Sequence, residues 1–219
     1  MRSFLAAELG LLVLILATHA VAEEGAQRLR PLELGLSSGY SSVGLRHPGS
    51  LDFNSLWAIP LLLDIDYRVS KRWSAGMYGE LGFIHNSAPD VEDVDQTLQG
   101  HHYRVGLEAI YHSAPERKVQ PWFGIGLGFD ALRATYRSRS TLPPFGSDLP
   151  DPGSSSPVRA TGFEVGHAQL GIDFAFVPAF AFGPFVGGSV VAYGRRRGVE
   201  SSEGFNVWSN LGLKATLRL

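Results

Sequence analysis

The sequence has no cysteine, so the chain can form neither disulfide bonds nor thiolate metal sites, and it cannot carry a lipid on an N-terminal cysteine. Charged residues are scarce, at 18% of 219 residues, and the net charge of −2 gives no reason to expect a nucleic acid partner. Long apolar runs are missing as well, because no segment after residue 22 is apolar enough for a membrane-spanning helix. If this chain enters a membrane, it must do so as a closed β-barrel.

The first 22 residues have the organisation of a secretory signal. Arg2 and the terminal amine supply positive charge, residues 9–17 form a short apolar core, and residues 20–22 have the small-x-small pattern of a cleavage site. The apolar core is too short to cross a membrane, which disfavours an uncleaved anchor. We expect residues 1–22 to be removed as a signal peptide, residues 23–30 to form a short periplasmic lead, and residues 31–219 to form the barrel.

Residues 59–83 show the pattern on which the interpretation of the whole chain rests. In 59–69, one alternate set of side chains is wholly apolar and the other carries Asp64, Asp66 and Arg68. A polar turn follows, and the alternation resumes over 73–83. Successive strand side chains point to opposite faces, so the pattern predicts a hairpin with one apolar face. Each strand is about as long as a tilted strand that crosses a bilayer.

The same alternation recurs along the chain and predicts eight strands, at 31–40, 59–69, 73–83, 101–112, 120–136, 161–176, 180–193 and 206–219. Their connections are long and short in strict alternation, as in transmembrane barrels with short periplasmic turns and longer extracellular loops. The sequence therefore predicts an all-β fold, an eight-stranded antiparallel up-and-down transmembrane β-barrel with both termini periplasmic. The rival interpretation is a soluble lipocalin-like barrel with its apolar face turned inward.

Aromatic residues gather near the predicted strand ends. Such rings favour the two membrane–water interfaces, so we expect them to form two girdles around the barrel. The girdle at the short-turn end would contain Tyr67, Trp73, Tyr111, Phe176 and Phe180, and the girdle at the long-loop end Tyr40, Phe83, Tyr103, Tyr136 and Tyr193.

The polar faces of the strands carry charges that would point into the barrel. Paired carboxylates can perform acid–base catalysis, but the interior of an eight-stranded barrel is just wide enough for side chains to fill it. Charges enclosed there must pair, so we expect a structural ion-pair network, with Glu33 near Arg218 fastening the closing seam. Its predicted members are Glu33, Asp64, Asp66, Arg68, Glu80, Arg104, Glu108, Asp130, Asp173, Lys214 and Arg218.

Five histidines fall toward the long-loop end of the predicted barrel. Imidazoles together with the carboxylates of the second long loop could bind a divalent metal, but no spacing matches a metal site, and we expect exposed rim histidines. These histidines are His47, His85, His101, His102 and His167.

His85 and Ser87 also resemble the catalytic pair of lipid A deacylase barrels, in which a histidine activates a serine. Glu80 or Glu92 would then have to orient the imidazole.

Arginines at the outer ends of two strands suit phosphate recognition, because the guanidinium fork matches phosphate geometry. Contact with the phosphates of lipopolysaccharide is therefore one interpretation, and ordinary solvated loop charge is the other. The residues are Arg133, Arg137, Arg139 and Arg195, Arg196 and Arg197.

The pattern of the whole domain resembles the outer-membrane β-barrel family of Gram-negative bacteria, which includes the barrel of outer membrane protein A and the outer membrane protein W-like proteins. The resemblance rests on QPWFGIGLGFD at 120–130, FGPFVGGSV at 182–190 and the final LGLKATLRL. It implies an outer-membrane protein that is inserted by the barrel assembly machinery and contacts outer-membrane lipid. It implies no catalytic, cofactor or metal site, and it leaves the oligomeric state open.

Two roles remain open at this point. The first is a structural or surface-interaction role for a barrel with a filled, charged lumen. The second is the binding or passage of a small apolar molecule, and a lipid A-modifying enzyme is a more distant third.

Overall fold

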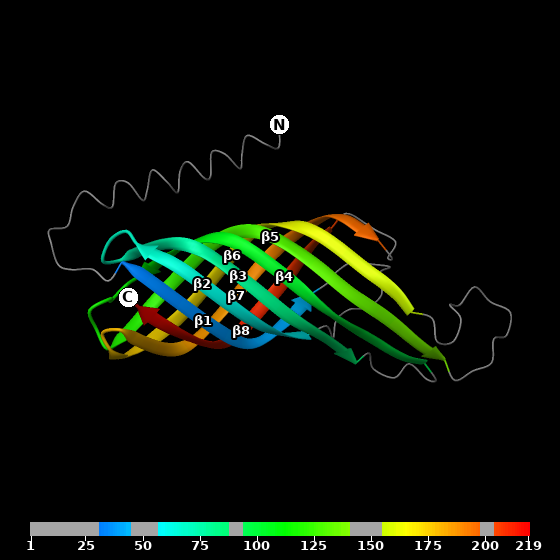
Figure 1. The fold of residues 1–219 in the computed structure, drawn as a ribbon, viewed down its shortest axis with the longest axis horizontal. Coiled ribbons are helices and arrows are strands. Elements are labelled where there is room, and N and C mark those ends of the chain that lie inside the picture. Colours follow the sequence, from blue (N-terminus) through cyan, green and yellow to red (C-terminus); the bar gives the residue numbers. More distant parts are fainter. Residues whose placement is uncertain (1–30, 45–56, 88–93, 141–154, 198–203) are drawn as a thin grey trace, which may run out of the picture.

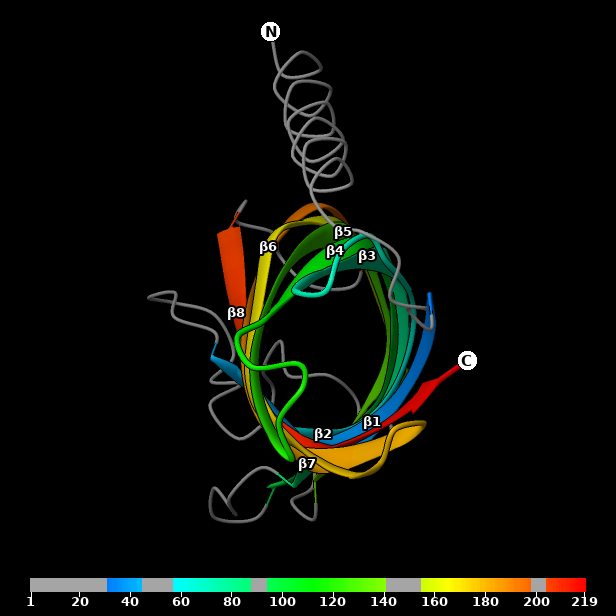
Figure 2. The same ribbon diagram turned by 90° about the vertical axis from the view of Figure 1, so that its left-hand side faces the viewer.

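The computed structural model describes residues 31–44, 57–87, 94–140, 155–197 and 204–219. They form one antiparallel sheet that closes on itself, so that each strand pairs with the next and β8 returns to β1 (Figures 1 and 2). Within these ranges no helix is long and apolar enough to cross a membrane. The strands are β1 (Leu32–Gly44), β2 (Trp57–Arg68), β3 (Trp73–Ser87), β4 (Val94–His112), β5 (Val119–Ser140), β6 (Ser155–Val177), β7 (Phe180–Arg197) and β8 (Gly204–Arg218). The predicted all-β, eight-stranded fold is therefore confirmed.

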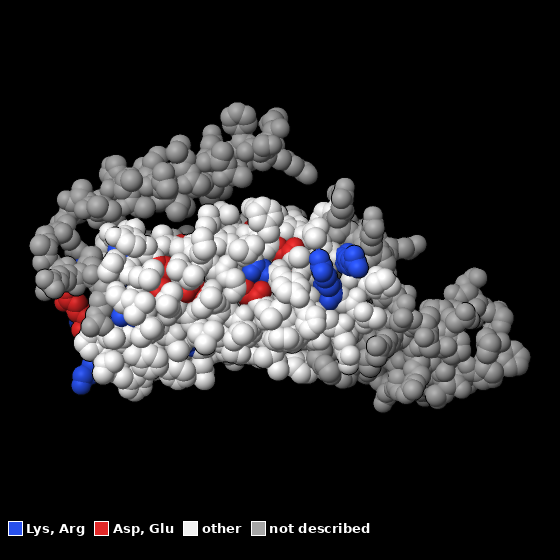
Figure 3. All heavy atoms as spheres, in the orientation of Figure 1, with Lys and Arg blue, Asp and Glu red and all other residues white. Residues whose placement is uncertain are grey.

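The two faces of the sheet differ as the sequence predicts. Along β2 every second residue is buried and the residues between are exposed. The exposed set is apolar, with Ile59, Leu61 and Leu63 each almost half exposed, while Asp64, which follows Leu63, is fully buried. Apolar side chains thus cover the outside, where Figure 3 shows a mostly uncharged wall. This arrangement is the reverse of a lipocalin-like barrel and excludes that interpretation.

Closure brings the two ends of the sheet into register. Glu33 on β1 lies opposite Asp66 on one side and opposite Arg218 of β8 on the other. The short connections, the C-terminus and the start of β1 share one end of the barrel (Figure 1). At the β2–β3 turn, the backbone amide of Trp73 donates a hydrogen bond to Ser70 Oγ at 3.1 Å, which explains the polar residues in so tight a connection.

The strands extend further toward the long-connection end than the alternation predicts. β4 begins at Val94 instead of 101, β5 runs to Ser140, and β6 begins at Ser155 instead of 161. Beyond the apolar wall the outward residues, such as Arg133 and Arg159, are polar, and the inward Ala134 and Ala160 are apolar. The pattern of apolar outward and polar inward residues therefore ends, although the backbone ladder continues. The long connections predicted between residues 83 and 101 and between residues 136 and 161 are to that extent wrong.

Most of the predicted aromatic girdles lie on the outer wall. Tyr67, Trp73, Phe176 and Phe180 are exposed near the short turns, and Trp73 packs against Tyr111 with ring centroids 5.1 Å apart. At the other end Tyr40, Phe83 and Tyr103 are exposed. Tyr193 was assigned to this girdle wrongly, because it is only 6% exposed and points into the lumen. The side chain of Tyr136 lies outside the described residues.

Candidate functional site

The lumen is the candidate site, because all eleven charges predicted to point inward are buried there. They fall into two groups at different depths. The lower cluster, toward the short turns, comprises Glu33, Asp64, Asp66, Arg68, Glu108, His112, Gln120, Asp173, Lys214 and Arg218. The upper cluster, toward the long connections, comprises Tyr78, Glu80, His102, Arg104, Asp130, Glu164, His167 and Tyr193.

Glu33 is the centre of the lower cluster. Its Oε1 accepts hydrogen bonds from Arg68 Nη2 at 2.6 Å and from Arg218 Nε at 2.9 Å. Arg218 Nη2 also donates to Gln120 Oε1 at 2.6 Å. One carboxylate therefore joins β1 to β2 and β8, and the predicted Glu33–Arg218 seam contact is confirmed. Two cations on one acid make this junction redundant.

Lys214 extends the lower cluster toward the middle of the lumen. Its Nζ lies 2.6 Å from Asp64 Oδ2 and 4.9 Å from the ring centroid of Trp122. Trp122 donates its indole N–H to Asp173 Oδ1 at 3.0 Å. A ring that contacts a cation through its face and a carboxylate through its edge fills space without leaving either charge unpaired.

A close approach lets Trp122 occupy this position. Gly171 on β6 faces its indole, and a Cβ on Gly171 would lie 2.4 Å from ring atoms. A larger residue there would have to displace the ring, so the glycine makes room for the aromatic side chain.

Arg104 is the centre of the upper cluster. Its Nη1 lies 3.3 Å from Glu80 Oε2, and its Nε lies 3.3 Å from Asp130 Oδ2 and 3.4 Å from Glu164 Oε1. All four side chains are fully buried. Its guanidinium carbon also lies 5.6 Å from the ring centroid of Trp208. A single arginine is thus shared by three carboxylates, the opposite arrangement to that around Glu33.

Hydroxyl and imidazole groups make further contacts to the upper carboxylates. Tyr193 donates its phenol O–H to Asp130 Oδ1 at 2.7 Å, and Tyr78 donates to Glu164. His102 Nε2 lies 2.8 Å from Glu80 Oε1, and His167 Nδ1 lies 3.3 Å from Glu164 Oε1. Each carboxylate therefore has a second partner besides Arg104.

A β-bulge creates part of the upper cluster. Glu164 and His167 both point inward although they are three residues apart, which a regular strand does not allow. The register of β6 shifts at this point against both β5 and β7, so one extra residue is accommodated between them. Sequence alternation missed Glu164 for this reason, since counting back from Asp173 would place it on the outer wall.

An apolar layer lies above the upper cluster. Ala58, Ile84, Val191 and Trp208 are all at most 3% exposed, and they pack together with Tyr193 and inward alanines of β5 and β6. Lower down, a hollow bordered by Glu33, Asp66 and Lys214 has a volume of about 10 Å³, which is about enough for one water molecule. Side chains therefore fill the lumen from the short turns to the apolar layer.

The histidines differ from the expectation of exposed rim residues. His102 and His167 are 0% and 3% exposed inside the barrel, and of the three of these histidines whose side chains the structure describes, only His101 lies on the outer wall. His102 is two residues from Arg104, and His167 is two residues from Gln169, so each shares a strand face with an inward residue. The alternation could therefore have placed both histidines inside. His47 and the side chain of His85 lie outside the described residues. Within the described residues, no three histidine or acidic side chains form a group that could hold a metal ion.

His85 and Ser87, the pair that resembles a deacylase motif, lie at the end of β3, and both side chains are outside the described residues, as is Glu92. Glu80, the other residue considered for orienting His85, instead points into the lumen and pairs with His102 and Arg104. It is therefore committed to a different contact.

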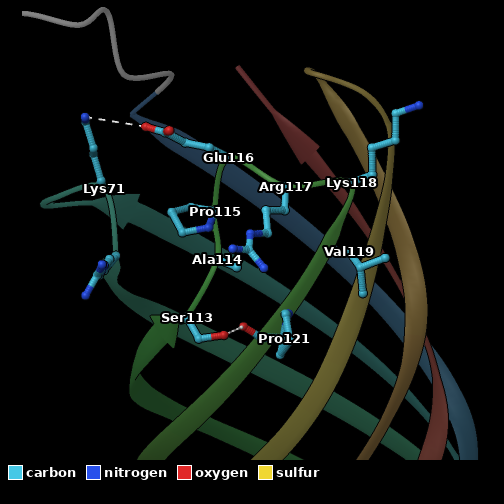
Figure 4. A pocket seen from close by; sticks show the side chains of 10 residues that line it. Lys71, Ser113, Ala114, Pro115, Glu116, Arg117, Lys118, Val119 and Pro121 are labelled. Carbon is cyan, nitrogen blue, oxygen red and sulfur yellow. Dashed lines mark hydrogen bonds and ion pairs between the residues drawn. The ribbon is translucent and has the colours of Figure 1, made fainter.

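A shallow basic hollow is present at the short-turn end of the wall (Figure 4). The β2–β3 turn contributes Lys71 and Arg72, and the β4–β5 turn contributes Arg117 and Lys118. Lys71 Nζ lies 3.5 Å from Glu116 Oε1, and both side chains are exposed enough to exchange this contact for water. It is an open rim, separate from the filled lumen.

No protein-family model matches the sequence, and no curated protein matches it significantly. Among solved structures, neisserial surface protein A is 16% identical with a TM-score of 0.50, over 90% of this chain and 100% of its own. Ail of Yersinia pestis is 16% identical over 85% and 98% of the two chains, with a TM-score of 0.47. OprG from Pseudomonas aeruginosa is 11% identical over 87% and 98%, with a TM-score of 0.45. The chain has the fold of the eight-stranded outer-membrane barrels.

Proposed function

We propose that this protein is an integral outer-membrane barrel of a Gram-negative bacterium, with a filled, charged lumen and a structural or surface-interaction role. The observation that carries the proposal is the lumen, in which ion pairs and aromatic rings occupy the space that a pore would need. A closed barrel with an apolar outer wall satisfies its backbone hydrogen bonds internally and suits a bilayer.

In the proposed orientation the short turns and both ends of the chain face the periplasm and the long connections face outward. Export would remove residues 1–22, leave 23–30 as a periplasmic lead, and deliver the chain to the barrel assembly machinery. Any surface interaction would then depend on the four long connections. Catalysis has no part in this proposal, because most of the buried carboxylates, such as Glu33, Asp64 and Asp130, are engaged in ion pairs with buried bases of the lumen.

Fractionation and single-channel recording test the two halves of the proposal. We expect the native protein in the outer-membrane fraction, with Glu23 as its first residue by N-terminal sequencing. In planar bilayers the purified barrel should give no steady conductance, while a porin recorded in the same bilayers provides the positive control. Recovery in the soluble periplasmic fraction would contradict membrane insertion.

A steady conductance, or uptake of a small apolar molecule by liposomes that contain the protein, would contradict the filled lumen. Either result would favour the alternative role of passing small molecules.

A further inference from the structure

Three basic residues lie side by side on the outer wall, near the long-connection end. His101 of β4 is paired in register with Arg133 of β5, and Arg133 is paired with Arg159 of β6. All three are exposed. Directly opposed residues on neighbouring strands have Cβ atoms about 5 Å apart, so these side chains start from adjacent points on one face. We call His101, Arg133 and Arg159 the basic row.

The basic row is unfavourable for the barrel by itself. Like charges that face each other across a strand pair repel, which destabilises the sheet. No carboxylate of the described residues forms an ion pair with Arg133 or Arg159, although acids accompany nearly every buried base of the lumen. On the next strand, the residue in register with Arg159 is Arg197, a further base. An external anion would offset this repulsion.

The height of the basic row on the wall indicates which anion. Below Arg133, the outward residues of β5 form an apolar series that begins at Phe123. Ten residues of a strand tilted by about 40° rise about 25 Å, the height of the apolar band of an outer-membrane barrel. Arg133 is therefore one step above the apolar band, at the level of the lipid headgroups. The series below it is Phe123, Ile125, Leu127, Phe129 and Ala131.

The basic row borders a hollow of about 600 Å³ in the outer wall, which Gln99, Thr135 and Pro157 also line. Phe83 stands at its edge, in edge-to-face contact with His101 at a centroid distance of 5.4 Å. In Figure 3, Lys and Arg side chains gather on the wall toward the long-connection end, while the wall nearer the middle is mostly uncharged. The site thus combines cations, amide and hydroxyl groups, and an aromatic ring at one level.

We propose that the basic row and its hollow form a binding site for the phosphorylated headgroup of lipid A. This inference rests on the proposed insertion, in which the long-connection end faces the outer leaflet. Acyl chains would pack on the apolar wall below, and a phosphate would lie between the guanidinium groups of Arg133 and Arg159, which suit it geometrically. Gln99 and Thr135 are placed to bond the sugar hydroxyls.

The test uses the full barrel in nanodiscs with bisphosphorylated lipid A as the titrated lipid. We expect the double variant Arg133→Gln/Arg159→Gln to bind lipid A about tenfold more weakly, since two charge-assisted contacts are lost. The matched control is Arg72→Gln/Arg117→Gln, which removes the same charge from the basic rim at the short-turn end. It should bind as tightly as the wild type.

A charge-reversing substitution should weaken lipid A binding but raise the stability of the barrel. Arg159→Glu would face Arg133 with a carboxylate, so the variant should lose lipid A binding while its unfolding temperature in lipid A-free nanodiscs rises. Higher stability together with weaker binding cannot result from misfolding. A variant that binds normally would overturn the proposal.

Two competitors separate lipid A from other sources of phosphate. Millimolar inorganic phosphate should fail to displace lipid A, and phosphatidylglycerol should bind the wild type and the double variant alike. Displacement by inorganic phosphate would overturn the lipid assignment. If the binding of phosphatidylglycerol depended on the basic row as strongly as the binding of lipid A does, the choice of lipid A would be overturned.

The same samples distinguish this failure from a failure of the proposed function. A barrel that inserts and stays closed to ions, but binds lipid A independently of the basic row, contradicts only the present inference. A chain that does not insert contradicts both.

Discussion

The two clusters of the lumen differ in how charge is shared. In the lower cluster one carboxylate, Glu33, is held by two cations, Arg68 and Arg218. In the upper cluster one cation, Arg104, is held by three carboxylates. Removal of one lower partner leaves Glu33 paired, whereas removal of Arg104 leaves three buried acids without a guanidinium. The junction at Glu33 and the contacts of Arg104 should therefore respond very differently to the loss of a single base.

The two clusters also differ in what they connect. The contacts of Glu33 join β1 to β2 and β8, the first and last strands of the chain, so the lower cluster secures the seam that closes the barrel. The contacts of Arg104 join β4 to β3, β5 and β6, strands that the backbone ladder already holds in sequence. The seam between β1 and β8 is thus held by an acid with two cations, whereas the contacts across β3 to β6 depend on one arginine.

The largest effect is expected for Arg104→Met. The substitution keeps an unbranched side chain in place but leaves Glu80, Asp130 and Glu164 buried without their shared cation. The free energy of unfolding should fall by about 3–5 kcal/mol, the usual cost of breaking a buried pair. Urea unfolding in liposomes measures it. The matched control is Arg72→Met on the exposed rim, and an equal effect of both substitutions would contradict the role of Arg104.

Substitutions on the outer wall should have the same effect on stability at the level of the lower cluster as at the level of the upper cluster. Leu63 is the outward neighbour of Asp64 in the lower cluster, and Val105 is the outward neighbour of Arg104 in the upper cluster; they are 49% and 58% exposed. Arginine at either position would face lipid, so Leu63→Arg and Val105→Arg should each lower the free energy of unfolding by about 2–4 kcal/mol. Insertion followed by urea titration provides the measurement. A much smaller cost at one level would show that this part of the wall does not face lipid.

A smaller effect is expected when the lower cluster loses one base. In Arg218→Met, Glu33 keeps the 2.6 Å contact with Arg68, while Gln120 loses a hydrogen-bond donor. We expect a loss of roughly 2 kcal/mol, less than for Arg104→Met. The double variant Arg68→Met/Arg218→Met should lose more than the sum of the single substitutions, because only then is Glu33 left without a cation. Additive losses would show that the two arginines do not substitute for each other.

The same comparison shows what the sequence could predict. The lower cluster follows from regular alternation in β1, β2 and β8, together with closure of the sheet, so Glu33, Arg68 and Arg218 could be placed together in advance. The upper cluster depends on the bulge in β6, and a one-residue insertion reverses the facing of everything beyond it. Glu164 could not be assigned from alternation for that reason.

Other errors had a signal that could have been used. His102 is two residues from Arg104 and therefore on the same, inward face of β4, and Tyr193 is on the same face of β7 as the buried Ser189. Both lie near the ends of predicted strands, which suggested positions at the rim. The basic row required tertiary information, because Arg159 falls in a segment that the sequence assigned to a loop. Only the strand extension and the cross-strand register place Arg159 beside Arg133.

The smallest effect tests whether the upper cluster behaves as one unit. Tyr193→Phe removes the hydroxyl that donates the 2.7 Å hydrogen bond to Asp130 but keeps the ring, while Arg104 still contacts that carboxylate. The expected loss in free energy of unfolding is about 1 kcal/mol. In an Arg104→Met background the same change removes the last of these partners of Asp130, so its cost should rise.

A double-mutant cycle measured by urea unfolding isolates this coupling. Ser41→Ala is the matched control, because it removes a buried hydrogen bond to Asn210, at 2.6 Å, that shares no partner with Arg104. The control should therefore be additive with Arg104→Met. If Tyr193→Phe is also additive with Arg104→Met, then Tyr193 and Arg104 stabilise Asp130 independently of each other. That result would contradict the proposed difference between the redundant contacts of Glu33 and the interdependent contacts of the upper cluster.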